Sequence, residues 1–196
     1  MKTFRISNIP TEFTEADLKL LLGGCPDVDS LAPAANAIDA PRKQVALVSF
    51  ETIPEGFETL RSIKIPKEML RKAKIEGRRG DLKVDCDFLG LTPLNRESGE
   101  IVMDVVAVAG GHAFGAWKAK SADFMWLRDA LPEDITGLRV LTYGFNAKLV
   151  GSTSFAGIAS YATELLEELK GTRDHYAASL FFSVLFPGTM RLKGAT

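Results

Sequence analysis

The residues best placed to do chemistry lie in a glycine-rich turn that follows a long apolar run. The run Ile101-Val-Met-Asp-Val-Val-Ala-Val108 leads into Ala109-Gly-Gly-His-Ala-Phe-Gly-Ala-Trp117. Glycines after a strand allow backbone amides to point into a pocket at the strand's carboxyl end, where open α/β sheets bind ligands. The turn also carries His112, which could act as a general base. The sequence therefore predicts a ligand pocket at this turn.

The elements that would position this turn are a strand, a helix and a second strand. Residues 101–108 are β-branched and apolar without polar alternation, which suits a strand of a parallel sheet covered on both faces. Residues 124–132 follow as a helix and residues 139–145 as the next strand. A second, amphipathic helix is expected after residue 154. Its apolar stripe is Phe155, Ile158, Ala162, Leu165, Leu166 and Leu169.

Four blocks of this region resemble a known family. They are Gly110-Gly-His-Ala-Phe-Gly-Ala-Trp117, Phe124-Met-Trp-Leu-Arg-Asp-Ala-Leu-Pro-Glu-Asp134, Arg139-Val-Leu-Thr-Tyr-Gly-Phe145 and Ser152-Thr-Ser-Phe155. Together they resemble the opening of the α/β-hydrolase domain of the serine active site-containing, lipase/esterase-like family, over residues 90–173. In many fungal proteins that domain precedes NACHT or NB-ARC modules.

The resemblance implies serine-dependent hydrolysis of ester or lipid substrates. It makes Gly110, Gly111 and His112 candidates for the oxyanion loop, whose amide donors each contribute about 2.7 to 4 kcal/mol of transition-state stabilisation. In the family, a further strand after residue 173 would lead to a Gly-His-Ser-x-Gly-Gly elbow, whereas this chain contains no Gly-x-Ser-x-Gly. We therefore expect a truncated, catalytically incompetent serine-hydrolase-like protein without catalytic residues, and ester or lipid hydrolysis in a longer form.

Three residues are candidates for members of a catalytic triad. Ser154 opens the amphipathic helix and is better explained as its N-cap than as a nucleophile. The resembled family has a histidine at the position of His112, which favours a loop-shaping role. His175 has no identifiable acid partner. The sequence therefore predicts no Ser, Asp and His set.

Aromatic residues beside the turn could line an acyl pocket or pack in the core. They are Phe114, Trp117 and Trp126, and their spacing favours core packing of a helix on the sheet. Arg128 and Asp129 are interpreted as helix-surface or capping charges. Residues 180–186 could add a helix or a strand that closes one side of a small parallel sheet.

The amino-terminal half has the pattern of an α+β ferredoxin-like domain. Residues 4–10, 43–50 and 82–88 are predicted strands, and residues 30–38 supply a weaker one. Residues 14–22, capped by Thr14 and stopped by Gly23, are a predicted helix, and residues 53–63 a second one. The resulting order is β-α-β-β-α-β.

This half, over residues 2–87, resembles the RNA recognition motif, with signature strands at residues 4–9 and 43–50. That family stacks bases on aromatic side chains, but the matching positions here are Arg5, Val45 and Leu47. Since stacking contributes about 1 to 3 kcal/mol per base, nucleic-acid binding is disfavoured. Arg5 and Lys43 are its candidate residues. A structural or interaction module is the favoured alternative.

The sequence divides into four parts. Residues 1–88 are the RNA-recognition-motif-like domain, 89–100 a linker or the first hydrolase strand, 101–173 the partial α/β-hydrolase-like parallel sheet and 174–196 a divergent tail. Residues 67–83 carry seven basic against three acidic side chains. Such a run can bind phosphates, although a solvated helix face is the commoner explanation.

Composition sets the outer limits. The chain has 196 residues, 46% of them apolar, and a net charge of −1, as expected of a globular protein of one or two domains. Cys25 and Cys86 are too few for a disulfide framework or a zinc cluster, and the glycines fit no phosphate-binding motif, so no cofactor or metal is expected. No apolar run reaches the roughly 18 residues of a transmembrane helix, and the amino terminus lacks a secretory signal.

We therefore expect an intracellular, cytoplasmic protein with a protein partner or self-association. The resemblance alone implies association with mitochondria or endoplasmic reticulum. The alternative function is a non-enzymatic protein-interaction module of a NACHT or NB-ARC signalling protein, and RNA binding is the third possibility.

Overall fold

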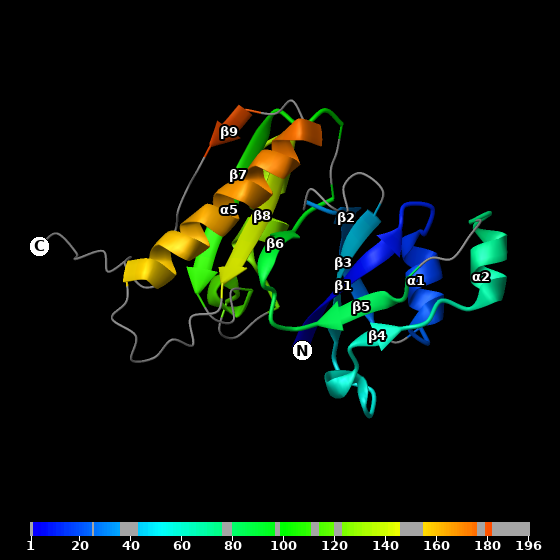
Figure 1. Cartoon of the computed structure of the whole chain (residues 1–196). Helices are drawn as coiled ribbons and strands as arrows, with labels where there is room; N and C mark the ends of the chain where they lie inside the picture. Colours follow the sequence, from blue (N-terminus) through cyan, green and yellow to red (C-terminus); the bar gives the residue numbers. More distant parts are fainter. Residues whose placement is uncertain are drawn as a thin grey trace, which may run out of the picture.

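The computed structural model describes residues 2–24, 26–35, 43–75, 80–96, 99–110, 114–119, 123–145, 155–175 and 179–181. These residues form two β-sheets that lie side by side (Figure 1). Helices α1 (Glu15–Leu21) and α2 (Lys67–Lys72) lie beyond the first sheet, and the long helix α5 (Phe155–His175) lies beyond the second. The two sheets therefore meet in the middle of the molecule.

The first sheet is antiparallel and has the strand order β2-β3-β1-β5-β4. Its strands are β1 (Lys2–Pro10), β2 (Asp27–Pro33), β3 (Lys43–Phe50), β4 (Ser62–Ile63) and β5 (Leu82–Asp85). The strands predicted around residues 4–10, 30–38, 43–50 and 82–88 are thus present, with somewhat different ends.

One face of this sheet packs on α1. Alternate residues of β1 and β3, including Phe4, Ile6 and Val48, are at most 1% exposed and share a core with Leu18 of α1. Helix α1 begins after Thr14, whose side chain accepts the amide hydrogen of Asp17 while the Asp17 carboxylate accepts that of Thr14. This reciprocal cap satisfies two amides that the helix itself cannot bond. The predicted Thr14 cap is confirmed.

The helix predicted over residues 53–63 is wrong. That segment contains a single 3₁₀ turn, η1 (Phe57–Thr59), followed by β4. Pro54 and Gly56 explain the difference, because Gly56 has a φ of 77°, outside the helical region. Phe57 is still buried in the first core, 5.0 Å from the Phe4 ring centre, so the apolar spacing reflects packing rather than a helix. The second helix is instead α2, which has no buried residues.

The second sheet is mixed, with the order β6-β8-β7-β9. Its strands are β6 (Gly90–Pro93), β7 (Met103–Gly110), β8 (Leu138–Phe145) and β9 (Ser179–Phe181). Strand β7 is parallel to both β8 and β9, whereas β6 is antiparallel to β8. Part of the segment between the two predicted domains is therefore a strand of this sheet.

Strand β7 is covered on both faces, as its apolar run predicts. Val106 and Val108 share a core with Leu169 of α5, whereas Ala107 and Ala109 belong to the core on the opposite face. All four are at most 7% exposed. Between β7 and β8 lie three short elements: η2 (Gly115–Trp117), α3 (Trp126–Asp129) and α4 (Leu131–Asp134). The single helix predicted over residues 124–132 is thus divided, at Ala130.

Helix α5 buries part of the predicted stripe, because Leu169 lies in a core cluster and Leu165 packs against the same cluster. Leu169 and Thr172 are at most 4% exposed, but Leu166 is 53% exposed and Ala162 is also exposed. The Thr172 hydroxyl lies within hydrogen-bond distance of the carbonyl oxygens of Ala35 and Glu168 and donates its single hydrogen to one of them at a time. The buried face therefore includes the polar residue Thr172 and leaves out Ala162 and Leu166. A search for apolar residues at helical spacing cannot predict a buried threonine. No helix in the described ranges is long and apolar enough to cross a membrane.

The second face of the first sheet is buried against the other half of the chain. Leu47 of β3 is fully buried in the core that also holds Leu94, Trp117 and Leu127. We call this contact the junction. It joins the two predicted domains through one continuous core cluster.

Candidate functional site

The carboxyl end of β7 is the first candidate site. Gly110, the last residue of β7, lies opposite Phe145 of β8. Gly111 and His112 lie outside the described residues, so no oxyanion geometry is assigned to them. Strand β9 runs parallel to β7 on its other side, with Val105 opposite Phe181. Three parallel strands thus point their carboxyl ends toward the same edge of the sheet.

Two of the three predicted aromatic residues lie in the core beneath this edge. Phe114 is 4% exposed and stacks on Phe88, with ring centres 4.7 Å apart and planes 14° from parallel. Trp117 is 9% exposed and packs in the same cluster, and its indole N–H has no hydrogen-bond partner in the described parts of the chain. Phe114 also lines a cavity of about 270 Å³ together with Cys86 and Lys118.

Trp126 was predicted to line a pocket or to pack in the core, and the core placement is wrong. Its side chain is 40% exposed, and Phe124 is 48% exposed. The intervening Met125 and the following Leu127 are both fully buried. Helix α3 has only four residues, and the positions on either side of Trp126 face the core. The Trp126 side chain therefore points outward.

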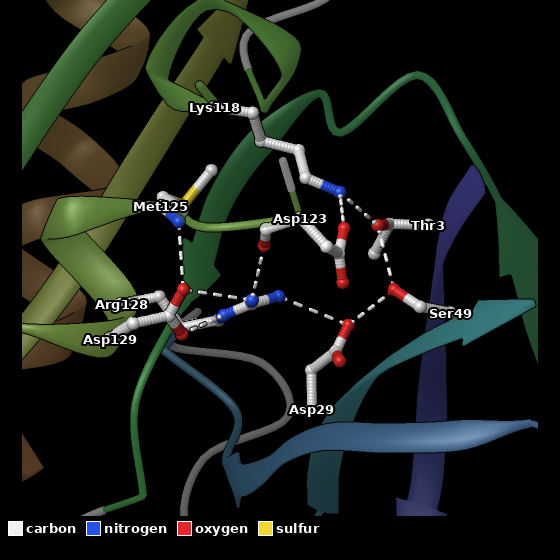
Figure 2. Close-up of polar contacts among 8 residues, drawn as sticks. All are labelled: Thr3, Asp29, Ser49, Lys118, Asp123, Met125, Arg128 and Asp129. Carbon is white, nitrogen blue, oxygen red and sulfur yellow. Dashed lines mark hydrogen bonds and ion pairs between the residues drawn. The ribbon is translucent and has the colours of Figure 1, made fainter. Parts of the chain in front are cut away.

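A chain of polar contacts crosses the junction (Figure 2). Its members, the junction network, are Thr3, Asp29, Ser49, Lys118, Asp123, Arg128 and Asp129. Ser49 donates to Asp29 at 2.5 Å, so its single hydroxyl hydrogen is used. Thr3 must then donate to Ser49 at 2.8 Å, and Thr3 accepts from the Lys118 ammonium at 3.1 Å. The relay therefore runs from an ammonium group to a carboxylate.

A β-bulge positions the carboxylate at the end of this relay. The register of β2 with β3 shifts between Val28 and Ser30, which leaves Asp29 as the extra residue. Its Oδ2 lies 3.1 Å from Nη1 of Arg128, and both side chains are 9% exposed. Nη1 forms no hydrogen bond with any of the described residues. Its contact with Asp29 is therefore an ion pair without hydrogen-bond geometry. Burial raises the pKa of Asp29 above its ordinary value of 3.8.

Arg128 and Asp129 hold the other side of the network. Asp129 accepts the amide of Met125 at 2.7 Å, which confirms a capping role for this residue. Arg128 donates to the Asp123 carbonyl at 2.9 Å and to Asp129 at 2.5 Å. It is not a surface charge, contrary to the prediction, because the junction covers it.

The junction network lacks the properties of a catalytic site. Ser49 is 1% exposed, so a substrate has no access to its hydroxyl, and the single hydroxyl hydrogen of Thr3 is donated to Ser49. The network does satisfy the polar groups that the junction buries, which would otherwise cost several kcal/mol. Sequence reasoning missed it because its members come from four separate segments. The Asp and Arg residues around Met125 are the one local signal.

The two residues predicted to bind nucleic acid, Arg5 and Lys43, lie at different places in the first sheet, and Arg5 is already hydrogen-bonded to other residues of the chain. Arg5 donates to Asp85 at 2.9 Å, to the Leu89 carbonyl at 2.8 Å and to Thr92 at 2.7 Å. It lies opposite Leu47 in the sheet, whereas the half-buried Lys43 lies opposite Pro10 at the far end. The two cations therefore form no common surface.

Two remaining candidates have little or no described environment. Ser154 lies outside the described residues, and His175 is the last residue of α5. Among the residues that the structure describes, no cluster of His, Cys, Asp and Glu could hold a metal ion. Comparison with known proteins finds no matching family model, no matching curated protein and no matching solved structure.

Proposed function

We propose that this chain is a serine-hydrolase-like scaffold of the lipase/esterase class, which lacks a serine nucleophile and does not hydrolyse esters by itself. The pairing of β9 with β7 carries the proposal: the strands are parallel neighbours, with Met103 opposite Ser179. Strand β9 pairs with the first residues of β7, with Phe181 opposite Val105, and runs in the direction of the sheet edge at which β7 ends with Gly110. A nucleophile elbow in the turn after one strand and an amide donor in the turn after another are what acyl transfer in such a fold needs.

A longer form would hydrolyse ester or lipid substrates through an elbow that follows β9. The 196 residues contain no Gly-x-Ser-x-Gly. Sequencing the native transcript through the codons for residues 171–196 tests this directly. A transcript that continues into an in-frame Gly-x-Ser-x-Gly segment is the expected result. A transcript that stops where this chain stops would exclude serine hydrolysis and leave an interaction module.

The second candidate function is a non-enzymatic protein-interaction module of a NACHT or NB-ARC type signalling protein. The second face of the first sheet disfavours RNA binding as the third possibility, since Leu47 and Val45 are at most 5% exposed there. The face that RNA recognition motifs use for bases thus contacts protein in this chain. We expect no salt-dependent binding of the full chain to single-stranded RNA. Binding that Arg5→Ala or Lys43→Ala abolishes would instead support RNA recognition.

A further inference from the structure

A cavity of about 390 Å³ lies where the first sheet meets β6 and α5. We call it the junction pocket. Its polar lining comes from both halves of the chain: Arg5, Arg61, Lys83 and Asp85 from the first, and Gly90 and Glu168 from the second. Small-ligand pockets usually measure about 300 to 1,000 Å³. At about 30 Å³ per water molecule, this one has room for a compact metabolite.

Two cations of the pocket form no ion pair with the part of the chain that the structure describes. Arg5 is neutralised by Asp85, its Nε lying 2.9 Å from Oδ2. Arg61 and Lys83, in contrast, form no ion pair within the described ranges, and both are exposed. Both residues line the pocket, Lys83 from β5 and Arg61 from the position before β4, whose carbonyl accepts the amide hydrogen of Val84 at 2.9 Å. Arg and Lys side chains at one pocket suit a phosphate dianion, which accepts several charge-assisted hydrogen bonds.

Glu168 supplies an acceptor on the opposite wall. Its Oε2 accepts the amide hydrogen of Leu91 at 2.8 Å, which orients the carboxylate. Its Oε1 would lie 2.9 Å from a Cβ at position 90, so Gly90 leaves the space that the carboxylate needs. Gly90 also has a φ of 74°, which favours glycine. Glu168 lines the pocket, and Leu91 occupies Oε2 alone, which leaves Oε1 as the acceptor that we assign to a ligand hydroxyl.

We propose that the junction pocket binds a small hydroxylated phosphate ester of the sugar phosphate kind. Arg61 and Lys83 bind the phosphate group, and Glu168 accepts a hydrogen bond from a hydroxyl group. The proposal is independent of the proposed function, because no serine nucleophile takes part. Since the lining spans both halves, the bound ligand also stabilises the junction.

Isothermal titration calorimetry of the full chain with glucose 6-phosphate and with inorganic phosphate, at constant ionic strength, tests the proposal. We expect saturable one-to-one binding of both probes. The double variant Arg61→Gln/Lys83→Gln should weaken both at least tenfold. The matched control Arg71→Gln/Lys72→Gln removes the same charge from the exposed helix α2 and should leave both affinities unchanged.

Glu168→Gln separates the two parts of the site, because the amide oxygen can still accept from Leu91. This variant should bind glucose 6-phosphate severalfold more weakly than the wild type and bind inorganic phosphate with unchanged affinity. Absence of saturable binding, or equal weakening by the α2 control, would overturn the proposal. So would sedimentation with phosphatidic acid vesicles without glucose 6-phosphate binding, because the ligand would then be a lipid headgroup.

Discussion

Asp104 of β7 and Arg139 of β8 lie directly opposite each other and form a two-pronged ion pair in the centre of the second sheet. The two N–O distances are 2.6 and 2.8 Å, and each residue is 1% exposed. A bidentate contact between a guanidinium and a carboxylate is among the strongest polar contacts in proteins. The pair fixes the register of the two parallel strands that lead to the candidate site.

Removal of one partner of this pair should destabilise the fold strongly. Asp104→Ala removes the carboxylate that accepts two hydrogen bonds from the buried Arg139 guanidinium, and we expect a loss of about 3 to 5 kcal/mol in the free energy of unfolding. The double variant Asp104→Leu/Arg139→Met should lose much less. Urea unfolding measures both, with Glu167→Ala, from an exposed ion pair with Lys170, as the control at under about 1 kcal/mol. An equal loss in Asp104→Ala and Glu167→Ala would contradict the buried pair.

This ion pair also indicates the reach of sequence reasoning. The apolar run around Asp104 predicts a strand covered on both faces, and this is correct, because a run of apolar and β-branched residues is a local property of the sequence. The partner of Asp104 could not be predicted, since the strand register is set by contacts between distant segments. The same holds for Asp29, whose bulge is invisible in a weak strand pattern. The prediction for Trp126 assumed one helix over residues 124–132, which would have packed the side chain on the sheet. The helix is divided at Ala130, and in the four-residue helix α3 the Trp126 side chain points outward.

Gly137, at the entry to β8, should tolerate a methyl group poorly. Its φ is 71°, and an added Cβ would lie 2.5 Å from Cγ2 of Val102 and 2.9 Å from the Glu100 carbonyl oxygen. Gly99 has a similar φ of 77° with nothing within 4 Å, which makes Gly99→Ala the matched control for backbone strain. We expect the control to lower the free energy of unfolding by about 1 to 2 kcal/mol. Gly137→Ala should lower it by about 1 to 3 kcal/mol more. Chemical denaturation that finds equal losses would refute the close contact.

Leu47 should couple the two halves. In a Trp126→Phe background, the fluorescence emission reports Trp117, which shares a core cluster with Leu47. Leu47→Ala should shift this emission to longer wavelength and cost about 2 to 5 kcal/mol. Val48→Ala, on the α1 face of the same strand, should destabilise the chain without that shift under native conditions. An equal shift in both variants would contradict burial of Leu47 in the junction.

Asp29 should make stability fall with rising pH. Burial raises its pKa above 3.8, so the folded chain keeps the proton over a window in which the unfolded chain has released it. Stability from this group is therefore greatest below 3.8 and falls as the pH rises through the window. The free energy of unfolding of the wild type, minus that of Asp29→Asn, should decrease over this range in urea titrations.

The exposed residue Asp27 of the same strand provides the control. The difference between the wild type and Asp27→Asn should not follow the decrease seen with Asp29→Asn. A difference for Asp29→Asn that stays constant or increases with pH would show that ion pairing with Arg128 outweighs burial.

Labelling with a fluorophosphonate serine probe tests the proposed function most directly. We predict no labelling of the purified 196-residue chain under conditions in which an active serine esterase is labelled fully. The product of a transcript that extends past β9 should be labelled at the serine of its Gly-x-Ser-x-Gly. Labelling of the 196-residue chain that Ser154→Ala abolishes would contradict the proposal, because this chain would then carry its own nucleophile.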